Sequence, residues 1–254
     1  MGARGLAPRT TLQCYRVLSS ALRQALRWQL IGTNPANAVQ PPRIERAALT
    51  VVDSKGLAKL LKAARGTDLE LPVMLAATTG LRRGELCGIR WSDIEETNDG
   101  AVLRVTGSMQ RVGGKLTRVA PKTARARRTV GLPPAVSDQL RRHRKDQTER
   151  RLLLGEGWAD NDLVLERGDG EPIDPDHLTH GVSKLAEAQG FTGLRLHDLR
   201  HAYASTLLRH GVHPKIVSEA LGHSSASFTM DVYQHVTPTL QRAAADAIEA
   251  ELKL

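Results

Sequence analysis

Apolar positions near the start of the chain repeat at the spacing of an α-helix. Residues 11–32 carry leucine, valine and alanine three or four positions apart, and the pattern ends near Gly32. A polar stretch with several prolines follows, which is typical of a linker. One helix and a loop cannot bury their own apolar face, so we expect residues 1–40 to be the C-terminal part of a helical domain. We place the linker at 41–50 and a second domain at 51–254.

The second domain is predicted to begin with helices. Asp53 or Ser54 can cap the first of them, because the side-chain oxygen accepts a hydrogen bond from the first turn. An apolar helix over 71–79 is stopped by Gly80, and a short amphipathic helix follows with Leu86 on its apolar side.

The hydrophobic period changes from that of a helix to that of a strand over residues 101–132. Alternating apolar and polar residues around a double-glycine turn predict a small antiparallel sheet. Two prolines then begin a long, strongly basic helix that reaches about Leu154, and a short strand is expected at 163–165.

Three or four further helices are expected from about Pro175 to the end of the chain. Pro175 and Pro214 suit the first turn of a helix, and glycines suit helix ends at Gly190, Gly211 and Gly222. The order of elements predicts a mainly α-helical fold with a small antiparallel β-sheet, an α+β class.

The composition of the chain favours some classes of partner and excludes others. The chain has 36 lysines and arginines against 27 aspartates and glutamates, a formal net charge of +9, which favours a polyanionic partner such as nucleic acid. No apolar run approaches the roughly 18 residues of a membrane span, so we expect no membrane partner. The 2 cysteines are too few for a disulfide framework or a thiolate zinc site, and a reducing, cytoplasmic setting is expected.

The unusual polar residues gather in a few short segments. These are Thr78–Leu86, Pro121–Thr123, His197–His201, Leu221–Ser225 and the single Tyr233. Arginines, a lysine, histidines and a tyrosine together suit attack on a phosphodiester. Forked guanidiniums can hold the charge that gathers on phosphoryl oxygens, and a tyrosine hydroxyl becomes a nucleophile when a nearby base accepts its proton.

In this order the segments resemble the tyrosine recombinase family, also called phage-type integrases. The resemblance covers roughly residues 45–240. It matches the family's Gly-Leu-Arg…Glu-Leu helix, hairpin lysine, His-x-x-Arg pair, Gly-His pair and late tyrosine. The matched residues are Arg82, Glu85, Lys122, His197, Arg200, His223 and Tyr233.

The resemblance implies a role for each matched residue. Tyr233 would attack a DNA phosphodiester, form a 3′-phosphotyrosyl link and release a 5′-hydroxyl. Arg82 and Arg200 would hold the non-bridging phosphate oxygens, and Lys122 would protonate the leaving oxygen.

Three further residues would support this chemistry. His197 would assist proton transfer at the nucleophile, and His223 would hydrogen-bond the phosphate. Glu85 would orient its neighbours through hydrogen bonds. His197 and His201, four residues apart, would also suit a metal pair, but no third ligand stands at a familiar spacing. We therefore expect no metal and no cofactor.

Two groups of arginines could contact the DNA backbone. Arg125, Arg127 and Arg128 follow the hairpin lysine, where a basic segment beside a cleavage site would touch phosphates. The arginines of the long basic helix could contact DNA or form a solvated helix face, and the sequence leaves both open.

The resemblance also implies partners. Family members act on double-stranded attachment sites, usually as a homotetramer on DNA that is weakly associated or monomeric without it, with accessory DNA-bending proteins in some systems. A phage or mobile-element protein of the bacterial cytoplasm, associated with the nucleoid, is expected. Residues 237–254 carry an apolar stripe that either folds onto its own domain or docks on a neighbouring protomer.

Two rival functions and one departure from the family remain. A non-catalytic DNA-binding protein and a type IB topoisomerase could use the same fold. Complete members carry a helical, SAM-like core-binding domain before the linker, whereas residues 1–40 hold only its last helix or two. A fragment, a late start site and a naturally short protein are all compatible with the sequence.

Overall fold

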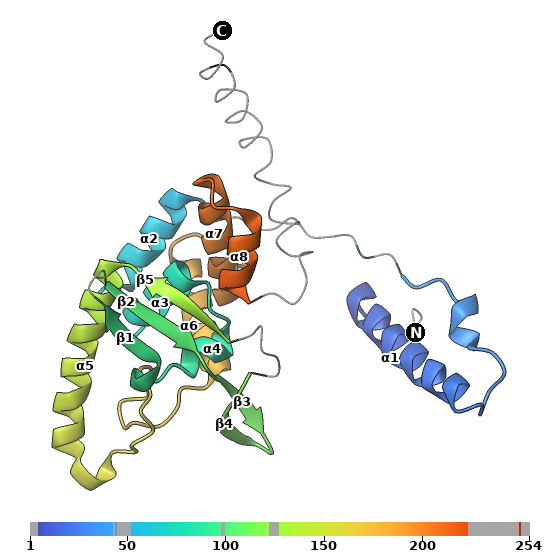
Figure 1. The fold of residues 1–254 in the computed structure, drawn as a ribbon, viewed down its shortest axis with the longest axis horizontal. Helices are drawn as coiled ribbons and strands as arrows, with labels where there is room; N and C mark the ends of the chain where they lie inside the picture. Colours follow the sequence, from blue (N-terminus) through green and yellow to red (C-terminus); the bar gives the residue numbers. More distant parts are fainter. Residues whose placement is uncertain are drawn as a thin grey trace. The chain divides into compact units, whose positions relative to one another are not determined.

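The structure of this chain is a computed structural model that divides into two units, Met1–Leu49 and Thr50–Leu254 (Figure 1). It describes residues 5–42, 44, 52–97, 100–121, 127–222 and 249. The two units are considered separately below.

The N-terminal unit is one long helix with a short 3₁₀ turn beside it. Helix α1 (Pro8–Arg27) begins with proline in its first turn, and the turn η2 spans Pro35–Ala38. The Tyr15 hydroxyl donates to the Ala36 carbonyl over 3.1 Å, and the Asn34 side-chain amide donates to the Ser19 carbonyl. The predicted helix is confirmed, although it ends five residues earlier than expected.

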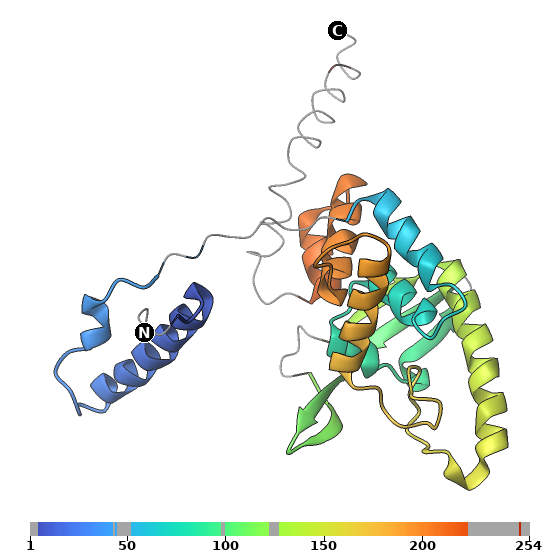
Figure 2. The same ribbon diagram turned by 180° about the vertical axis from the view of Figure 1, so that it is seen from behind.

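Seven α-helices are described in the second unit. They are α2 (Ser54–Ala64), α3 (Glu70–Thr79), α4 (Arg83–Cys87), α5 (Pro134–Leu154), α6 (Pro175–Ala188), α7 (Leu196–Arg209) and α8 (Pro214–Leu221). Helix α3 is apolar on all sides, and packs against α2, α5 and α7, which explains why nearly all of it is buried. Figure 2 shows these helices from behind.

Local signals in the sequence set the ends of these helices. The Asp53 carboxylate accepts a hydrogen bond from the Gly56 amide over 2.7 Å and so caps α2. Proline occupies the first turn of α6 and α8, and Gly190, Gly211 and Gly222 all have positive φ just past helix ends. These predicted boundaries are confirmed.

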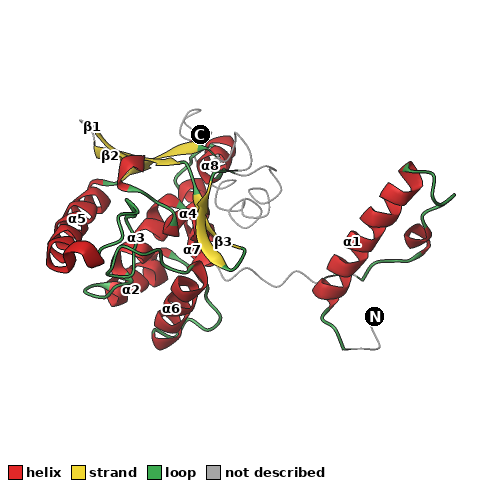
Figure 3. Ribbon diagram, turned by 90° about the horizontal axis from the view of Figure 1, so that it is seen from below, coloured by secondary structure: helices red, strands yellow, loops and turns green. Residues whose placement is uncertain are grey.

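The strands form two sheets where one was expected. Strands β1 (Ile94–Thr97), β2 (Gly100–Val105) and β5 (Arg128–Leu132) make a three-stranded antiparallel sheet in the order β1-β2-β5. Among the described strands, β3 (Ser108–Val112) and β4 (Lys115–Val119) pair with each other in a separate hairpin, whose tip extends away from the helices in Figure 1. Figure 3 shows the strands in yellow among the red helices. The α+β class is confirmed.

Glycine lets helix α4 approach the β3 backbone closely. A Cβ atom on Gly84 would lie 2.7 Å from the Met109 carbonyl oxygen, and one on Gly88 would lie 3.0 Å from the Met109 amide nitrogen. The Arg118 guanidinium of β4 donates to the Gly88 carbonyl over 2.7 Å and to the Asp93 carboxylate over 2.8 Å. The base of the hairpin is therefore fixed to the helix that begins next to Arg82.

The strand predicted at 163–165 is wrong. Leu163 makes one isolated bridge with Arg90, and the Val164 amide donates to the Ile89 carbonyl over 2.9 Å. The segment is apolar because it is buried beside α5, where a ring nitrogen of His143 hydrogen-bonds the Val164 carbonyl. Burial without a neighbouring strand accounts for a pattern that suggested a strand.

Candidate active site

Arg82 lies at the turn between α3 and α4, and this turn requires glycine. Gly80 ends α3 with φ +61°, and a Cβ atom there would lie 2.5 Å from the Tyr203 ring. The Arg82 backbone amide donates to Glu85 Oε2 over 2.9 Å, and its Nη1 donates to Glu85 Oε1 over 2.8 Å. One carboxylate thus fixes both the backbone and the side chain of Arg82.

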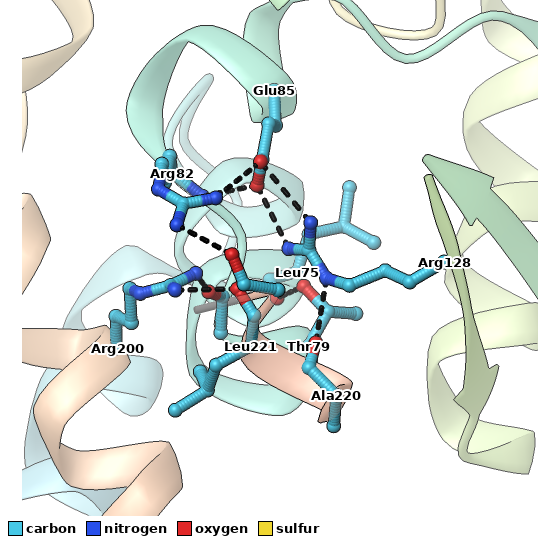
Figure 4. Close-up of polar contacts among 10 residues, drawn as sticks. Leu75, Thr79, Arg82, Glu85, Arg128, Arg200, Ala220 and Leu221 are labelled. Atoms are coloured by element: carbon cyan, nitrogen blue, oxygen red, sulfur yellow. Dashed lines mark hydrogen bonds and ion pairs between the residues drawn. The ribbon is translucent and has the colours of Figure 1, made fainter. Parts of the chain in front are cut away.

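A second arginine reaches the same carboxylate from strand β5. Arg128 donates from Nη1 to Glu85 Oε1 over 3.1 Å and from Nη2 to Glu85 Oε2 over 2.8 Å (Figure 4). The Arg128 side chain is 6% exposed and that of Glu85 8%. The sequence predicts that Arg128 contacts the DNA backbone, whereas in this structure its guanidinium is directed into the protein interior and pairs with Glu85.

Arg200 comes from helix α7 and is almost completely buried, with 1% of its surface exposed. Its Nη1 donates to the Gly80 carbonyl and its Nη2 to the Leu221 carbonyl, each over 2.5 Å. Among the described residues, the buried Nε of Arg200 has no hydrogen-bond partner. Arg200 therefore joins the end of α3 to the end of α8.

All three guanidiniums donate hydrogen bonds to backbone carbonyls at the C-terminal end of α8. Arg128 Nε donates to the Ala220 carbonyl over 2.6 Å, Arg200 to the Leu221 carbonyl, and Arg82 Nη2 to the Gly222 carbonyl over 2.9 Å. The last carbonyls of a helix have no partner within the helix and carry its negative partial charge, so cations are favoured there. Three successive carbonyls are satisfied in this way (Figure 4).

Burial and neighbouring charges set the ionisation of this cluster, in which three guanidiniums surround one carboxylate. Burial raises the pKa of Glu85, but hydrogen bonds and charge from Arg128 and then Arg82 outweigh it and hold that pKa at about 2. Burial, together with the nearby charge of Arg82, lowers the pKa of Arg200 to about 9. Glu85 is therefore an anion and Arg200 a cation at neutral pH.

His197 lies in the first turn of α7, and its ring meets that of His201 edge to face at a centroid distance of 5.0 Å. Burial and the charge of Arg200 lower the pKa of His197, while burial and His197 lower that of His201 to about 4. A neutral His197 at pH 7 can accept a proton. Within the described part of the chain, no group of three His, Cys, Asp or Glu side chains could hold a metal ion.

The structure gives a position to some of the predicted site residues. It brings Arg82, Glu85 and Arg200 together, with Arg128 joining them, and places Arg127 in an exposed position before β5. Lys122, Arg125, His223 and Tyr233 lie outside the described residues. Their roles remain predictions.

Strand alternation in the sequence is a signal for the buried position of Arg128. Val130 and Leu132 are buried on the inner face of β5, and Arg128 precedes Val130 by two residues, so strand alternation places it on the same face. The run of positive charge over residues 125–128 suggests an exposed position instead, and the alternation is the better guide.

Comparison with solved structures defines the class to which this fold belongs. The structure matches that of the Tn1549 transposon integrase in complex with a circular intermediate DNA with a TM-score of 0.80 at 20% identity, over 97% of this chain and 82% of that one. The XerA recombinase matches with a TM-score of 0.60 at 21% identity, over 82% of this chain and 66% of that one. The fold is that of a tyrosine recombinase.

Sequence comparison then identifies the family. The model of the phage integrase family matches residues 50–239, and the chain belongs to this family. A tyrosine recombinase XerC-like protein of Caldanaerobacter subterraneus subsp. tengcongensis is 33% identical over 217 residues, covering 81% of this chain and 55% of that protein. An integrase of Saccharopolyspora erythraea is 27% identical over 297 residues, covering 96% of this chain and 67% of the relative. The chain spans about half to two thirds of the length of these curated relatives.

Proposed function

We propose that this chain is the catalytic part of a site-specific DNA recombinase that cleaves and rejoins DNA through a 3′-phosphotyrosyl intermediate at Tyr233. One observation carries the proposal. Arg82 and Arg200 come from separate motifs, and their guanidiniums donate to the neighbouring carbonyls of Gly222 and Leu221. Two cations held this close together suit a phosphate whose charge grows in the transition state.

The reaction needs no external energy source. The Tyr233 oxygen forms a bond to phosphorus as the bond to the 5′-oxygen breaks, and the leaving 5′-hydroxyl takes a proton from Lys122. His197 accepts the tyrosine proton, and His223 hydrogen-bonds the phosphate. The same steps in reverse join a second 5′-hydroxyl to the 3′-phosphate, because the protein–DNA ester keeps the energy of the original bond.

The access of DNA to the two arginines differs. The Arg82 side chain is 40% exposed, whereas Arg200 is buried. We therefore assign to Arg82 the first contact with the scissile phosphate, and to Arg200 the support of charge from within.

The proposed partners follow from the family. The substrate is a double-stranded attachment site of a phage or mobile element, bound by a homotetramer with accessory DNA-bending proteins in a bacterial cytoplasm, at the nucleoid. The N-terminal unit would be part of a core-binding domain that grips the same DNA. The relatives reported above are an integrase and a recombinase, which does not favour a topoisomerase or a non-catalytic protein. No described helix is long and apolar enough to cross a membrane.

A covalent-capture experiment tests the proposal. The protein is incubated with a pool of DNA duplexes that are nicked near a randomised core, so that cleavage releases a short fragment and cannot be reversed. We expect an adduct that survives denaturation, which Tyr233→Phe abolishes and Tyr15→Phe leaves intact. Sequencing the captured DNA yields a preferred duplex.

Two results would overturn the proposal. An adduct that persists in Tyr233→Phe would mean that another residue is the nucleophile. Relaxation of supercoiled plasmid without any sequence preference in the captured DNA would favour the topoisomerase alternative.

A further inference from the structure

Arg128 is buried among the residues of the candidate site, although no step of the proposed reaction uses it. It begins β5, six residues after Lys122 in the sequence, and its side chain is 6% exposed. The described contacts of its guanidinium are with Glu85 and the Ala220 carbonyl, and none of the catalytic roles assigned above uses it. Its neighbour Arg127 is exposed.

Resting on the proposed function, we infer that Arg128 is a positioning residue, which fixes the Glu85 carboxylate and through it the direction of the Arg82 guanidinium. It contacts the groups that hold the catalytic arginine in place. It has no contact with DNA in this role.

The hydrogen bonds of Glu85 support this inference. Oε1 accepts from the side chains of Arg82 and Arg128, and Oε2 accepts from the Arg82 backbone amide and Arg128. A carboxylate offers about four lone-pair sites, so these four bonds saturate it. Without Arg128, half of the sites of a buried anion lose their donors, and the carboxylate is free to turn away from Arg82.

Arg128 also links segments that carry different catalytic residues. Through Glu85 it reaches the turn of Arg82, and through the Ala220 carbonyl it reaches the end of α8, shortly before His223. A Cβ atom on Gly222 would lie 2.9 Å from Arg128 Nη1, so the small residue leaves room for the guanidinium. The end of α8 and the turn of Arg82 are therefore held by one side chain.

The alternative is that Arg128 contributes charge to DNA binding, as Arg125 and Arg127 are expected to do. The two roles predict changes in different measured quantities. A backbone contact alters the affinity for DNA and its salt dependence, whereas a positioning residue alters the rate of cleavage in the bound complex.

The test compares Arg128→Gln and Arg128→Lys with the neighbouring variant Arg127→Gln. For each, the dissociation constant for the captured duplex and the single-turnover rate of adduct formation at saturating DNA are measured. We expect Arg128→Gln to slow adduct formation roughly 30- to 100-fold, because hydrogen bonds to a buried charge are lost, with affinity changed less than about threefold.

Arg128→Lys keeps the charge but not the fork, so we expect partial rescue, to a rate about tenfold below that of the wild type. Arg127→Gln, at a residue expected to contact the DNA backbone, should weaken DNA binding and so serves as the reference for an effect on affinity. In a Glu85→Gln background, Arg128→Gln should slow the reaction by less than about threefold more, because the group through which Arg128 acts is already changed.

Several outcomes would overturn the inference. A wild-type rate in Arg128→Gln would do so, as would a loss of affinity alone, matched by Arg127→Gln. If Arg128→Gln does not fold by circular dichroism, Arg128→Lys decides, and a wild-type rate in that variant counts against positioning by the fork. The absence of any adduct in the wild-type protein overturns the proposed function itself, and the positioning role falls with it.

Discussion

Helix α5 and the C-terminal turn of α8 are both rich in arginine contacts, but they use the charge differently. On α5, Arg141 pairs with Asp138 and Arg151 pairs with Asp160, in side chains that are more than half exposed. At the end of α8, the guanidiniums of Arg82, Arg128 and Arg200 converge on three successive carbonyls, and two of these arginines are buried.

Burial, and not the number of charges, decides how much an arginine contributes to the stability of the protein. Exposed ion pairs are screened by water and are worth about 0–1 kcal/mol. Breaking a buried pair leaves an uncompensated charge and costs about 3–5 kcal/mol. The net charge of +9 therefore reveals little about which arginines build the site.

Removing the Glu85 carboxylate, the counter-charge that Arg128 contacts, should have the greatest effect on stability. Glu85→Ala should lower the free energy of unfolding by about 3–5 kcal/mol, because Arg128 stays buried without its counter-charge. Urea denaturation at pH 7 measures this. The control on α5 is Asp138→Ala, which removes an exposed partner of Arg141 and should cost less than about 1 kcal/mol. Equal costs for the two variants would remove the distinction between the regions.

A smaller effect is expected from pH, through the histidines beside the cluster. Burial and His197 lower the pKa of His201 from 6.5 to about 4, so between these values the unfolded chain binds a proton that the folded protein does not. Stability should therefore fall by roughly 1–3 kcal/mol as the pH drops from 6.5 to 4. A second loss follows as the pH drops from 4.5 toward 2, where Glu85 becomes protonated.

Urea denaturation at pH 7, 5.5 and 4 measures the first of these losses. His201→Gln should flatten the dependence of stability on pH between pH 6.5 and 4. An unchanged slope in His201→Gln would show that the titrating group is elsewhere.

The smallest effect is expected on α5 itself. Arg141→Gln removes surface pairs with Asp138 and Glu96 and should change the free energy of unfolding by less than about 0.5 kcal/mol. The same denaturation experiment in low and high salt checks it. A cost above 1 kcal/mol would mean that the network on α5 is cooperative and that the two regions are more alike than their exposure indicates.

Much of the fold could be predicted because its signals are local. The cap at Asp53, the stop at Gly80 and the first-turn Pro175 each act within a few residues of their own position. Strand β1 (Ile94–Thr97) was missed because it has one apolar residue in four and is defined by pairing with β2. No local pattern reports such a pairing.

The site residues also differ in whether a local signal or a distant contact sets their position. Arg82 and Arg200 could be assigned because each lies in a recognisable motif, and Glu85 lies one helical turn from Arg82. The place of Arg128 depends on contacts with residues 43 and 92 positions away along the chain. Such contacts exist only after the sheet has packed against α4 and α8, so a run of charged residues is a poor guide to them.

The glycine contacts between α4 and β3 have a consequence for the design of chimaeras. Gly84 and Gly88 bring the helix against the strand backbone, and Arg118 holds the second strand to the same helix. Helix α4 and the β3–β4 hairpin thus pack as one structural unit. A hairpin exchanged between two relatives should be transplanted together with its helix, since a junction inside this unit would separate parts that are shaped to fit each other.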